Sequence, residues 1–411
     1  MKVLQVNCVY RTGSTGKITA DLHQALKEKG VSAVVCYGRG SRRAPEQGVY
    51  RIAGESYAKW NHLLANITGV MYGGCLLSTA RLLHIIRKEK PDVVHLQCIN
   101  GYFVNIYRLI AWLRDHHIKT VLTLHAEFMY TANCGHALEC DQYHSGCEHC
   151  PRWRQETGSL FFDRTARSFR KMQAAFAGFS DDLLVTSVSP WLMDRALSSS
   201  ILAGKRHKVI FNGLDAGVFF PRNCEEQKKK LGLQGKKILF HATPYFSGDP
   251  QHIKGGYYVI ELARRLLPQN VTVLVAGNYA PDLNLPANIR LLGNIRDQDR
   301  LAELYSMADA TVIASKRETF SMVCAESLCC GTPVVGFVAG APEQIALPRY
   351  STFCPYGDME ALVCAVSDRI RQGKEATASL AREAKERYSR DRMVEEYLSA
   401  YHALITKKDN P

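Results

Sequence analysis

Two series of short apolar segments, each followed by an amphipathic helical pattern, constrain the fold of this chain most. In the first series we predict helices at residues 18–29, 78–88 and 106–116, and strands at residues 3–9, 32–37, 93–97 and 120–125. Nearly continuous apolar strands that alternate with amphipathic helices indicate a parallel sheet covered on both faces. Because such crossovers are almost always right-handed, the expected result is a doubly wound domain.

A second series begins near residue 236 and predicts another domain of the same class. Its predicted helices are 256–267, 299–307 and 320–330, and its predicted strands are 237–242, 271–276, 289–292, 310–314 and 333–337. Residues 212–221 are rich in turn formers and mark the junction. The sequence therefore predicts an α/β chain of two doubly wound, Rossmann-like domains, residues 1–210 and 211–389. Open α/β sheets bind ligands at the carboxyl ends of their strands, so we expect the site in an inter-domain cleft that both domains face.

Charge is unevenly distributed along the 411 residues, whose net charge is +13. Residues 1–215 hold 27 Lys and Arg against 17 Asp and Glu, whereas the remainder holds 25 against 22. A basic half suggests an anionic partner, such as a phosphorylated carrier, an anionic membrane surface or nucleic acid. A merely basic surface is the alternative. We expect no nucleic-acid binding, because the chain has no aromatic–basic strand motif and no C2H2 zinc-finger spacing.

Cysteine usage and hydropathy indicate a cytoplasmic location. Most of the 14 cysteines stand singly in apolar runs, where cysteine acts as a small core residue. The first ten residues are expected to form a buried strand rather than a signal peptide. No apolar stretch reaches about 18 residues, so a membrane-spanning helix is not expected.

The segment 315–335 carries the strongest chemical signal. Glu318 follows a predicted strand, and residues 319–321 lead into a helix whose first N–H groups can receive phosphate oxygens. Glu326 lies about two helical turns further on and faces back toward the same end. A carboxylate there can accept hydrogen bonds from paired hydroxyls, as on a ribose. On spacing alone, a helix glutamate that caps the helix or pairs with Lys316 explains the pattern equally well.

This E-x7-E pattern, followed by C-G-T-P-V-V, resembles the retaining glycosyltransferases of family 4, which have the GT-B architecture. Other segments are similar to motifs of the same family. They are the linker Asn212-Gly213-Leu214-Asp215, the motif Lys254-Gly255-Gly256, the glycine loop 13–17, and a closing helix with Tyr388, Tyr397 and Tyr401. The resemblance implies that the C-terminal helix, residues 390–411, packs back on the first domain.

The resemblance also implies roles for individual residues in a nucleotide-sugar site. Glu318 would contact the hydroxyls of the transferred sugar, and Glu326 the ribose. The diphosphate would meet Lys254, the glycine loop at Gly13 and Gly16, and the backbone N–H groups of Phe320, Ser321 and Met322. Because positive charge and helix dipoles can stabilise a diphosphate leaving group, we expect no catalytic metal. Base and sugar contacts are expected in the loops 277–281 and 294–297.

Two positions depart from the family pattern. The family has an arginine a few residues before the lysine, but residues 244–253 contain none, so His241, His252 or another residue assists Lys254, or Lys254 acts alone. The family also has His-Asp after a strand of the first domain, near the reacting centre. Here His125 is followed by Ala126, and Glu127 is the candidate substitute. Without the resemblance, a lone histidine at a strand end is more often structural.

A dense cysteine cluster occupies residues 134–150. It contains Cys134, Cys140, Cys147 and Cys150, with three histidines interleaved. The C-x-x-C spacing of the last pair suits a structural zinc ion, while disulfides and free thiols are the alternatives. The block resembles an insertion in the subgroup of family 4 that builds bacterial surface polysaccharides of the colanic-acid type. That subgroup also has motifs similar to residues 100–102 and 189–192. We interpret the cluster as a loop that shapes the acceptor side.

Taken together, the residues and the resemblance predict a retaining glycosyltransferase of the hexosyltransferase type. It would move sugar from a UDP- or GDP-sugar to a glycan acceptor, held on a polyprenyl diphosphate at the inner face of the membrane. The protein would be cytoplasmic and peripheral. Candidate membrane contacts are Arg42, Arg43, Arg164, Arg167, Arg170 and Lys171. A nucleotide-sugar epimerase or phosphorylase of the same architecture is the alternative, whereas a phosphate-loop kinase is disfavoured because Arg11 and Ile18 break its motif.

Overall fold

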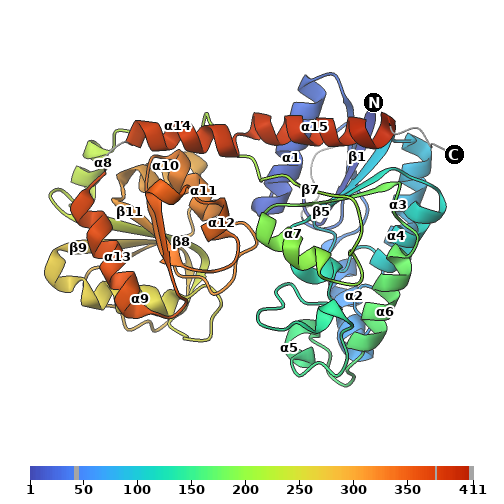
Figure 1. Cartoon of the computed structure of the whole chain (residues 1–411), viewed down its shortest axis with the longest axis horizontal. Helices are drawn as coiled ribbons and strands as arrows, with labels where there is room; N and C mark the ends of the chain where they lie inside the picture. The colour runs from blue at the N-terminus through green and yellow to red at the C-terminus, as the bar shows by residue number, and fades with distance from the viewer. Residues whose placement is uncertain (41–45, 375–376, 407–411) are drawn as a thin grey trace. The chain divides into compact units, whose positions relative to one another are not determined.

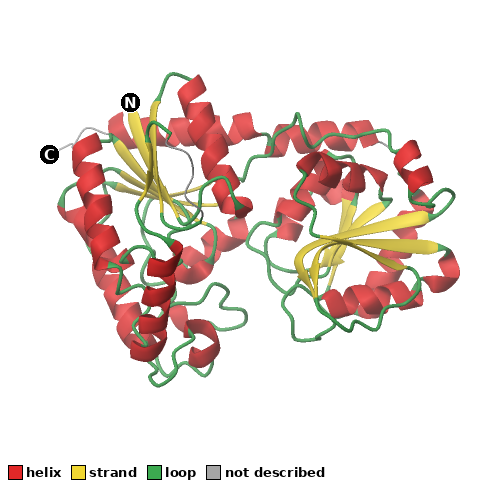
Figure 2. Cartoon of the chain, turned by 180° about the vertical axis from the view of Figure 1, so that it is seen from behind, coloured by secondary structure: helices red, strands yellow, loops and turns green. Residues whose placement is uncertain are grey.

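The computed structural model describes residues 1–40, 46–374 and 377–406, so Arg42 and Arg43 lie outside the described residues. The chain divides into two compact units (Figure 1). Unit 1 comprises Met1–Phe211 and the C-terminal segment from Met393, and unit 2 comprises Asn212–Arg392. In each unit a parallel sheet lies between helices (Figure 2).

Unit 1 is built on a seven-stranded sheet in the order β3-β2-β1-β4-β5-β6-β7, with every neighbouring pair parallel. The strands are β1 (Lys2–Asn7), β2 (Ser32–Tyr37), β3 (Val49–Arg51), β4 (Val93–Leu96), β5 (Thr120–Leu124), β6 (Leu183–Ser187) and β7 (His207–Val209). The helices are α1 (Gly13–Glu28), α2 (Glu55–Thr68), α3 (Leu76–Glu89), α4 (Ile106–Asp115), α5 (Trp153–Thr157), α6 (Thr165–Phe176) and α7 (Pro190–Leu197), with 3-10 turns at Glu127–Met129 and Gln142–His144.

Local sequence explains where two helices of unit 1 begin and why its central strands are buried. The Asn105 side chain accepts a hydrogen bond from Arg108 N and caps α4. Ser189 caps α7 through Leu192 N, and Pro190 occupies the first turn, where its missing N–H costs nothing. The central strands β1, β4 and β5 are almost wholly buried, as expected of a sheet covered on both faces.

Unit 2 repeats the architecture with a six-stranded parallel sheet in the order β10-β9-β8-β11-β12-β13. The strands are β8 (Lys237–Phe246), β9 (Val271–Tyr279), β10 (Ile289–Gly293), β11 (Ala310–Ile313), β12 (Val334–Phe337) and β13 (Ser351–Cys354). The helices are α8 (Glu225–Lys230), α9 (Gly256–Arg265), α10 (Gln298–Met307), α11 (Met322–Cys329), α12 (Pro342–Ile345), α13 (Met359–Gln372), α14 (Thr377–Tyr388) and α15 (Arg390–Thr406), with 3-10 turns at Leu267–Gln269 and Pro348–Tyr350. Helix α15 passes from unit 2 into unit 1 at Met393.

The strand order confirms the prediction of two doubly wound, Rossmann-like domains. In unit 1 the order reverses between β1 and β4, and in unit 2 it reverses between β8 and β11. At such a switch point the loops leave neighbouring strands in opposite directions and open a crevice at the carboxyl edge of the sheet. The ligand site of unit 2 is therefore to be sought in the loops that follow β8 and β11.

Two predicted helix starts are wrong. Residues 13–17 were expected to form a loop before a helix beginning at residue 18, but α1 begins at Gly13. Gly16 lies inside that helix, where a Cβ atom would stand 3.0 Å from Val9 Cγ2, so this glycine permits close packing on the preceding turn. Helix α11 begins at Met322 rather than residue 320, because Ser321 has φ 75° and cannot continue a right-handed helix.

Helix α15 is anchored in unit 1 by buried tyrosines. His95 on β4 lies between two hydroxyls, with Nδ1 2.7 Å from the Tyr401 hydroxyl and Nε2 2.7 Å from Thr123 Oγ1. Thr123 in turn lies 3.0 Å from the Tyr397 hydroxyl. Burial, with a smaller contribution from His125, lowers the pKa of His95 to about 3. No helix in the described part of the chain is long and apolar enough to cross a membrane.

The buried His95 predicts a specific acid sensitivity of unit 1. Unfolded histidine binds a proton near pH 6.5, but native His95 does so only near pH 3, so the unfolded state binds more protons between these values. Stability from this group is therefore lost as pH falls below about 6.5, by at most about 1.4 kcal/mol per pH unit. In melting curves recorded at pH 7.5 and pH 5, the stability gap between wild type and His95→Gln should narrow at the lower pH. A gap of constant size would contradict the buried neutral imidazole.

Candidate functional site

The loops that follow β8 and β11 bring Lys254 and Glu318 together. Lys254 Nζ lies 2.7 Å from Glu318 Oε1, and both side chains are about one-fifth to one-quarter exposed, at 24% and 19%. The loops themselves are joined, because Lys316 N donates to Ile253 O at 2.8 Å. Two residues 64 positions apart in sequence thus form one ion pair at the switch point of the sheet.

Two glycines make the approach of these loops possible. Gly255 has φ 66°, and a Cβ atom there would stand 1.9 Å from Ala314 O. A Cβ atom on Gly256 would stand 2.5 Å from Ser247 O. A side chain at Gly255 would push the loop after β8 away from β11, and a side chain at Gly256 would clash within the loop after β8 itself. The Lys-Gly-Gly motif therefore has a steric reason at both glycines.

The backbone around Glu318 is held from the other side by the turn after β12. Glu318 N donates to Ala339 O at 2.9 Å, and Ala341 N donates to Glu318 O at 3.2 Å. The Glu343 carboxylate accepts hydrogen bonds from the amides of Ala339 and Gly340, at 3.1 and 2.9 Å. This turn fixes the backbone from which the Glu318 side chain reaches Lys254.

The N-terminus of α11 follows Glu318 directly. Ser321 caps the helix, since its hydroxyl accepts a hydrogen bond from Cys324 N at 3.3 Å. Phe320 is buried, and its ring lies 6.5 Å from that of Tyr388 in an edge-to-face arrangement. The first N–H groups of a helix have no intrahelical partner and carry the positive end of the dipole. Met322 and its neighbours therefore present backbone donors beside the Lys254–Glu318 pair.

Glu326 lines a pocket of about 240 Å³ at the carboxyl edge of the same sheet. Its carboxylate accepts a hydrogen bond from the Tyr305 hydroxyl at 2.8 Å, and the Tyr305 ring is fully buried against Phe240. Burial and the Glu326 charge raise the pKa of Tyr305 well above its ordinary value, so the phenol stays a donor. Met322 and Val323 also line the pocket, so α11 faces both the pocket and the ion pair.

A bulge in β8 shapes the far wall of this pocket. The pairing of β8 with β9 shifts between Ala242 and Tyr245, and Thr243 and Pro244 at the bulge line the pocket together with Gly277. Gly277 has φ 141°, and a Cβ atom there would stand 1.8 Å from Thr243 O. Asn294 and Ile295 complete the rim, so both loops expected to hold base and sugar contribute residues to the pocket.

Neither histidine near Lys254 has the chemistry of an arginine. His241 Nδ1 lies 2.9 Å from Val312 O and must donate to it, and Nε2, which has no hydrogen-bond partner, then carries a lone pair. Burial lowers the pKa of His241 to about 4, so the ring is neutral near pH 7. His252 Nδ1 accepts a weak hydrogen bond from Lys254 N at 3.4 Å. The cations nearest to Glu318 in sequence are Lys316 and Arg317.

In unit 1, His125 lies at the carboxyl end of β5 and begins a chain of side-chain hydrogen bonds. Its Nε2 atom lies 3.2 Å from Gln97 Oε1, Gln97 donates to Gln5 Oε1 at 2.8 Å, and Gln5 reaches Thr19 O at 3.4 Å. Because Gln97 uses its amide N–H on Gln5, its oxygen accepts from His125. Burial lowers the pKa of His125 to about 4, so the ring is a neutral donor near pH 7. Gly13 and Gly16 lie in the first turns of α1, at the same edge of the sheet.

Glu127 has a structural environment. Its carboxylate is fully buried and accepts hydrogen bonds from Arg195 Nε at 2.7 Å, from the Tyr130 hydroxyl at 2.9 Å and from Ala137 N at 2.7 Å. A carboxylate with three donors and no exposed surface cannot reach a ligand without breaking this network. Glu127 is thus suited to anchor the cysteine-rich segment rather than to replace the missing aspartate.

The four clustered cysteines are free thiols. Burial raises the pKa of Cys134 above its usual range, and the charges of Glu156, Cys150 and Cys147 raise it further. Within the described residues, no group of three or more His, Cys, Asp or Glu side chains is placed to hold a metal ion. The structural-zinc interpretation therefore stays a prediction from spacing.

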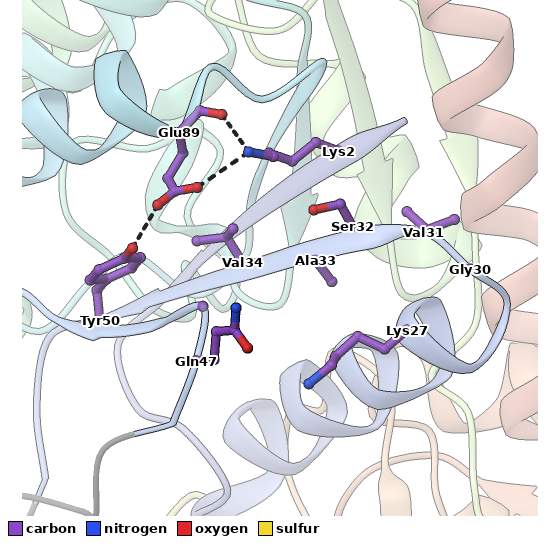
Figure 3. A pocket seen from close by; sticks show the side chains of 11 residues that line it. Lys2, Lys27, Gly30, Val31, Ser32, Ala33, Val34, Gln47, Tyr50 and Glu89 are labelled. Carbon is purple, nitrogen blue, oxygen red and sulfur yellow. Dashed lines mark hydrogen bonds and ion pairs between the residues drawn. The ribbon is translucent and has the colours of Figure 1, made fainter.

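Unit 1 also contains a shallow pocket of about 600 Å³ at the amino ends of β1 and β2 (Figure 3). Three of its polar groups satisfy one another: Lys2 Nζ donates to Glu89 O and Oε2 at 2.8 and 3.3 Å, and the Tyr50 hydroxyl donates to Glu89 Oε1 at 2.6 Å. This pocket lies at the opposite edge of the sheet from the edge at which doubly wound domains bind ligands. The pocket lined by Glu326 remains the stronger candidate site.

Comparison with family models covers both units. The model described as Glycosyltransferase Family 4 matches residues 15–217, and the model described as Glycosyl transferases group 1 matches residues 223–387. Together with the two doubly wound sheets, these matches define a glycosyltransferase with the GT-B fold. The chain belongs to glycosyltransferase family 4.

Two curated relatives illustrate the range of the resemblance. The putative colanic acid biosynthesis glycosyl transferase WcaC of Escherichia coli (strain K12) is 22% identical over 426 residues, which cover 98% of this chain and 100% of that protein. The N-acetyl-alpha-D-glucosaminyl L-malate synthase of Bacillus anthracis is 24% identical over 246 residues. That second match spans 57% of this chain and 63% of the enzyme's own length.

Solved structures share the fold over almost the whole chain. Sucrose-phosphate synthase from Thermosynechococcus elongatus superposes with a TM-score of 0.68 at 15% identity, covering 99% of this chain and 100% of that chain. Anabaena Alr3699/HepE in complex with UDP superposes with a TM-score of 0.67 at 16% identity, covering 98% and 100%. At these identities the likeness shows the GT-B fold.

The steric role of Gly277 leads to a stability prediction with a matched control. Gly277→Ala places a methyl group against Thr243 O, whereas Gly293→Ala, at φ 71°, meets nothing within 4 Å. The control should cost about 1 kcal/mol for its backbone conformation, and Gly277→Ala about 2 kcal/mol more because the bulge must move. Thermal or urea unfolding measures both. Equal destabilisation of the two variants would contradict the close approach at Thr243.

Proposed function

We propose that this family 4 member is a retaining hexosyltransferase that uses a UDP- or GDP-sugar as donor. The observation that carries the proposal is the Lys254–Glu318 pair beside the N-terminus of α11, next to the pocket lined by Glu326. The sugar and the diphosphate of a donor are bonded neighbours. A carboxylate and an ammonium group 2.7 Å apart suit those two neighbours, with sugar hydroxyls at Glu318 and phosphate oxygens at Lys254.

The nucleoside is proposed to occupy the pocket of about 240 Å³. Glu326, oriented by the Tyr305 hydroxyl, would accept hydrogen bonds from the ribose. The base would lie between the bulge of β8 and the loop at Asn294 and Ile295. The complexes of Alr3699/HepE with UDP and with UDP-glucose support a nucleotide sugar as the ligand class.

The leaving group is proposed to be stabilised without a catalytic metal. When the bond between the anomeric carbon and the diphosphate breaks, negative charge collects on the phosphate oxygens. Lys254 and the backbone N–H groups at Phe320, Ser321 and Met322 would receive that charge. Lys316 and Arg317 add positive charge within two residues of Glu318. The family pattern has its arginine at another place, a few residues before the lysine.

His125, Gly13 and Gly16 are the proposed contributions of unit 1. His125 would accept a hydrogen bond at Nδ1 from a hydroxyl of the transferred sugar, since its ring is neutral and donates its N–H at Nε2 to Gln97. The first turn of α1 would approach the diphosphate at Gly13 and Gly16. Full-length similarity to the WcaC protein supports a glycan acceptor in surface polysaccharide synthesis. We propose a polyprenyl-diphosphate carrier for that acceptor, at the inner face of the membrane.

Substitutions of Glu326 and of Glu318 should have different effects on binding and on turnover. Glu326→Gln should weaken binding of the preferred nucleotide sugar by about 10–100-fold, because a charged acceptor for the ribose is lost. Glu318→Gln should leave the Kd of the free nucleotide within about threefold while lowering kcat/KM about 100-fold. Calorimetric titration after a thermal-shift screen of UDP- and GDP-sugars measures the first effect, and turnover with a lipid-linked acceptor measures the second.

The exposed Glu360 supplies the matched control, since its carboxylate lies on the surface of the same unit and Glu360→Gln should change neither quantity. Proton NMR of the product should show the anomeric configuration of the donor. Inversion of that configuration would refute the retaining assignment. Conversion of the donor into another nucleotide sugar in the absence of acceptor would show that the protein is an epimerase and not a transferase.

Substitution of Lys254 should affect the binding of nucleoside diphosphates more than the binding of nucleoside monophosphates. Lys254→Ala should weaken nucleoside diphosphate binding about tenfold and nucleoside monophosphate binding much less, because the lysine lies beside Glu318 rather than in the Glu326 pocket. Lys236→Ala removes a lysine elsewhere in unit 2 and should leave both affinities unchanged. If Lys254→Ala lost equal affinity for the nucleoside monophosphate and the nucleoside diphosphate, the proposed role of Lys254 in binding the diphosphate would be wrong.

A further inference from the structure

Exposed apolar side chains gather in one region of unit 1. The described part of the chain exposes fourteen large apolar side chains, and nine of them belong to three segments of this unit. The other five are scattered over unit 2. The nine are Trp60, Leu63, Leu64 and Ile67 on α2, Leu76 and Leu77 at the start of α3, and Leu160, Phe161 and Phe162 in the loop after α5.

Helix α2 presents its apolar face to solvent. Trp60, Leu63, Leu64 and Ile67 follow the spacing i, i+3, i+4 and i+7, which places them on one side of a helix. Their exposed fractions run from 42% to 66%. The buried face of the helix holds only Ala58 and Ala65. An amphipathic helix that buries two alanines and exposes its large side chains is inverted relative to an ordinary surface helix.

The three segments are joined by hydrogen bonds, and we name their nine exposed apolar side chains the apolar face. Leu160 N donates to Asn66 O at 2.8 Å, which ties the loop after α5 to the end of α2. Cys75 N donates to Asn61 Oδ1 at 2.8 Å, which ties the start of α3 to the middle of α2. Figure 1 shows α2, α5 and α6 at the same end of unit 1.

Positive charge borders the apolar face. Arg164 lies with its guanidinium 5.0 Å from the centre of the Phe162 ring. Arg167, Arg170 and Lys171 follow on α6, and burial together with the charges of Arg167 and Arg164 lowers the pKa of Lys171. Among the described residues, no carboxylate forms an ion pair with any of these four cations.

The carboxylates of these segments are already engaged. Glu55, at the start of α2, pairs with Arg39. Asp163 accepts hydrogen bonds from the backbone of Cys150 at 2.9 Å and of Thr165 at 3.0 Å. The border of the apolar face is therefore cationic and lacks its counter-charge. A core of Trp, Leu and Phe flanked by Arg and Lys is the composition that binds the interface of a bilayer carrying anionic lipids.

We propose that the apolar face is a docking surface for a lipid bilayer with anionic headgroups. The side chains of α2, of the start of α3 and of the 160–162 loop enter the boundary between headgroups and acyl chains. Arg164, Arg167, Arg170 and Lys171 contact the headgroup phosphates. The surface lies wholly in unit 1 and does not depend on the donor chemistry of unit 2.

Vesicle co-sedimentation of the full-length protein tests this surface. The protein should bind vesicles with about 30% phosphatidylglycerol at least tenfold more tightly than pure phosphatidylcholine vesicles, and binding should weaken as salt rises to about 0.5 M. Leu63→Gln with Leu64→Gln should lower the partition coefficient about tenfold. Arg167→Glu with Arg170→Glu should remove the preference for anionic vesicles. All four side chains lie on the surface, so melting curves should match wild type.

Two controls distinguish vesicle binding by the apolar face from non-specific adsorption of exposed apolar side chains and from effects of the donor site. Leu267→Gln changes an exposed apolar side chain of unit 2, 46% exposed, and should not alter vesicle binding. Glu326→Gln should bind vesicles as wild type does while losing nucleotide affinity. Trp60 gives a direct readout, because brominated lipid should quench wild-type fluorescence and the vesicle-dependent part of that quenching should disappear in Trp60→Phe.

Three results would overturn the proposal. The first is equal binding to neutral and anionic vesicles. The second is unchanged binding by Leu63→Gln with Leu64→Gln. The third is a dimer in sedimentation velocity that this double variant dissociates, without vesicle binding by the wild type, since a second copy would then cover the apolar face.

Discussion

The backbone contact between the loops after β8 and β11 is the constraint on which the rest of unit 2 depends. Gly255 brings one loop to within contact of Ala314 O, and Lys316 N reaches back to Ile253 O. Only this approach allows a lysine and a glutamate from two different crossovers to share one ion pair. The same edge of the sheet then supplies the start of α11 and, through the bulge of β8, the wall of the Glu326 pocket. The strand order puts the candidate site at the switch point of the sheet, and the glycines allow the loops around it to approach one another closely.

Much of this could be predicted from sequence because the signals are local. Apolar strands that alternate with amphipathic helices determined the two parallel sheets, and the spacing of Glu318 and Glu326 indicated a helix start between them. Long-range partners had no such signal. Nothing near Tyr305 in sequence reveals that its hydroxyl orients Glu326, and nothing near Glu343 reveals that it holds the turn behind Glu318. Both residues lie in other crossovers and meet the site only after folding.

The errors and omissions have physical causes as well. The helix starts at residues 13 and 322 were misplaced because a glycine or serine at positive φ can end a turn at several neighbouring positions. Helix α2 was not predicted, although its large apolar side chains have helical spacing, because the face that it buries carries only two alanines and the large side chains face solvent. Glu127 looked like a substitute for an active-site aspartate, whereas its partner Arg195 is 68 residues away and could not be inferred from the chain. Residues that act by contact with solvent or ligand leave weaker sequence patterns than residues that build the core.

The buried network around Glu127 limits how this chain can change over evolutionary time. Loss of Arg195 alone would strand a carboxylate without exposed surface, at a cost of about 3–5 kcal/mol, and loss of Glu127 alone would leave the guanidinium and the Ala137 amide unsatisfied. The two positions are therefore expected to be exchanged together, as one covarying pair, in related sequences. Because the network also holds the cysteine-rich segment at Ala137 N and Leu138 O, a change at either position would reach that segment as well.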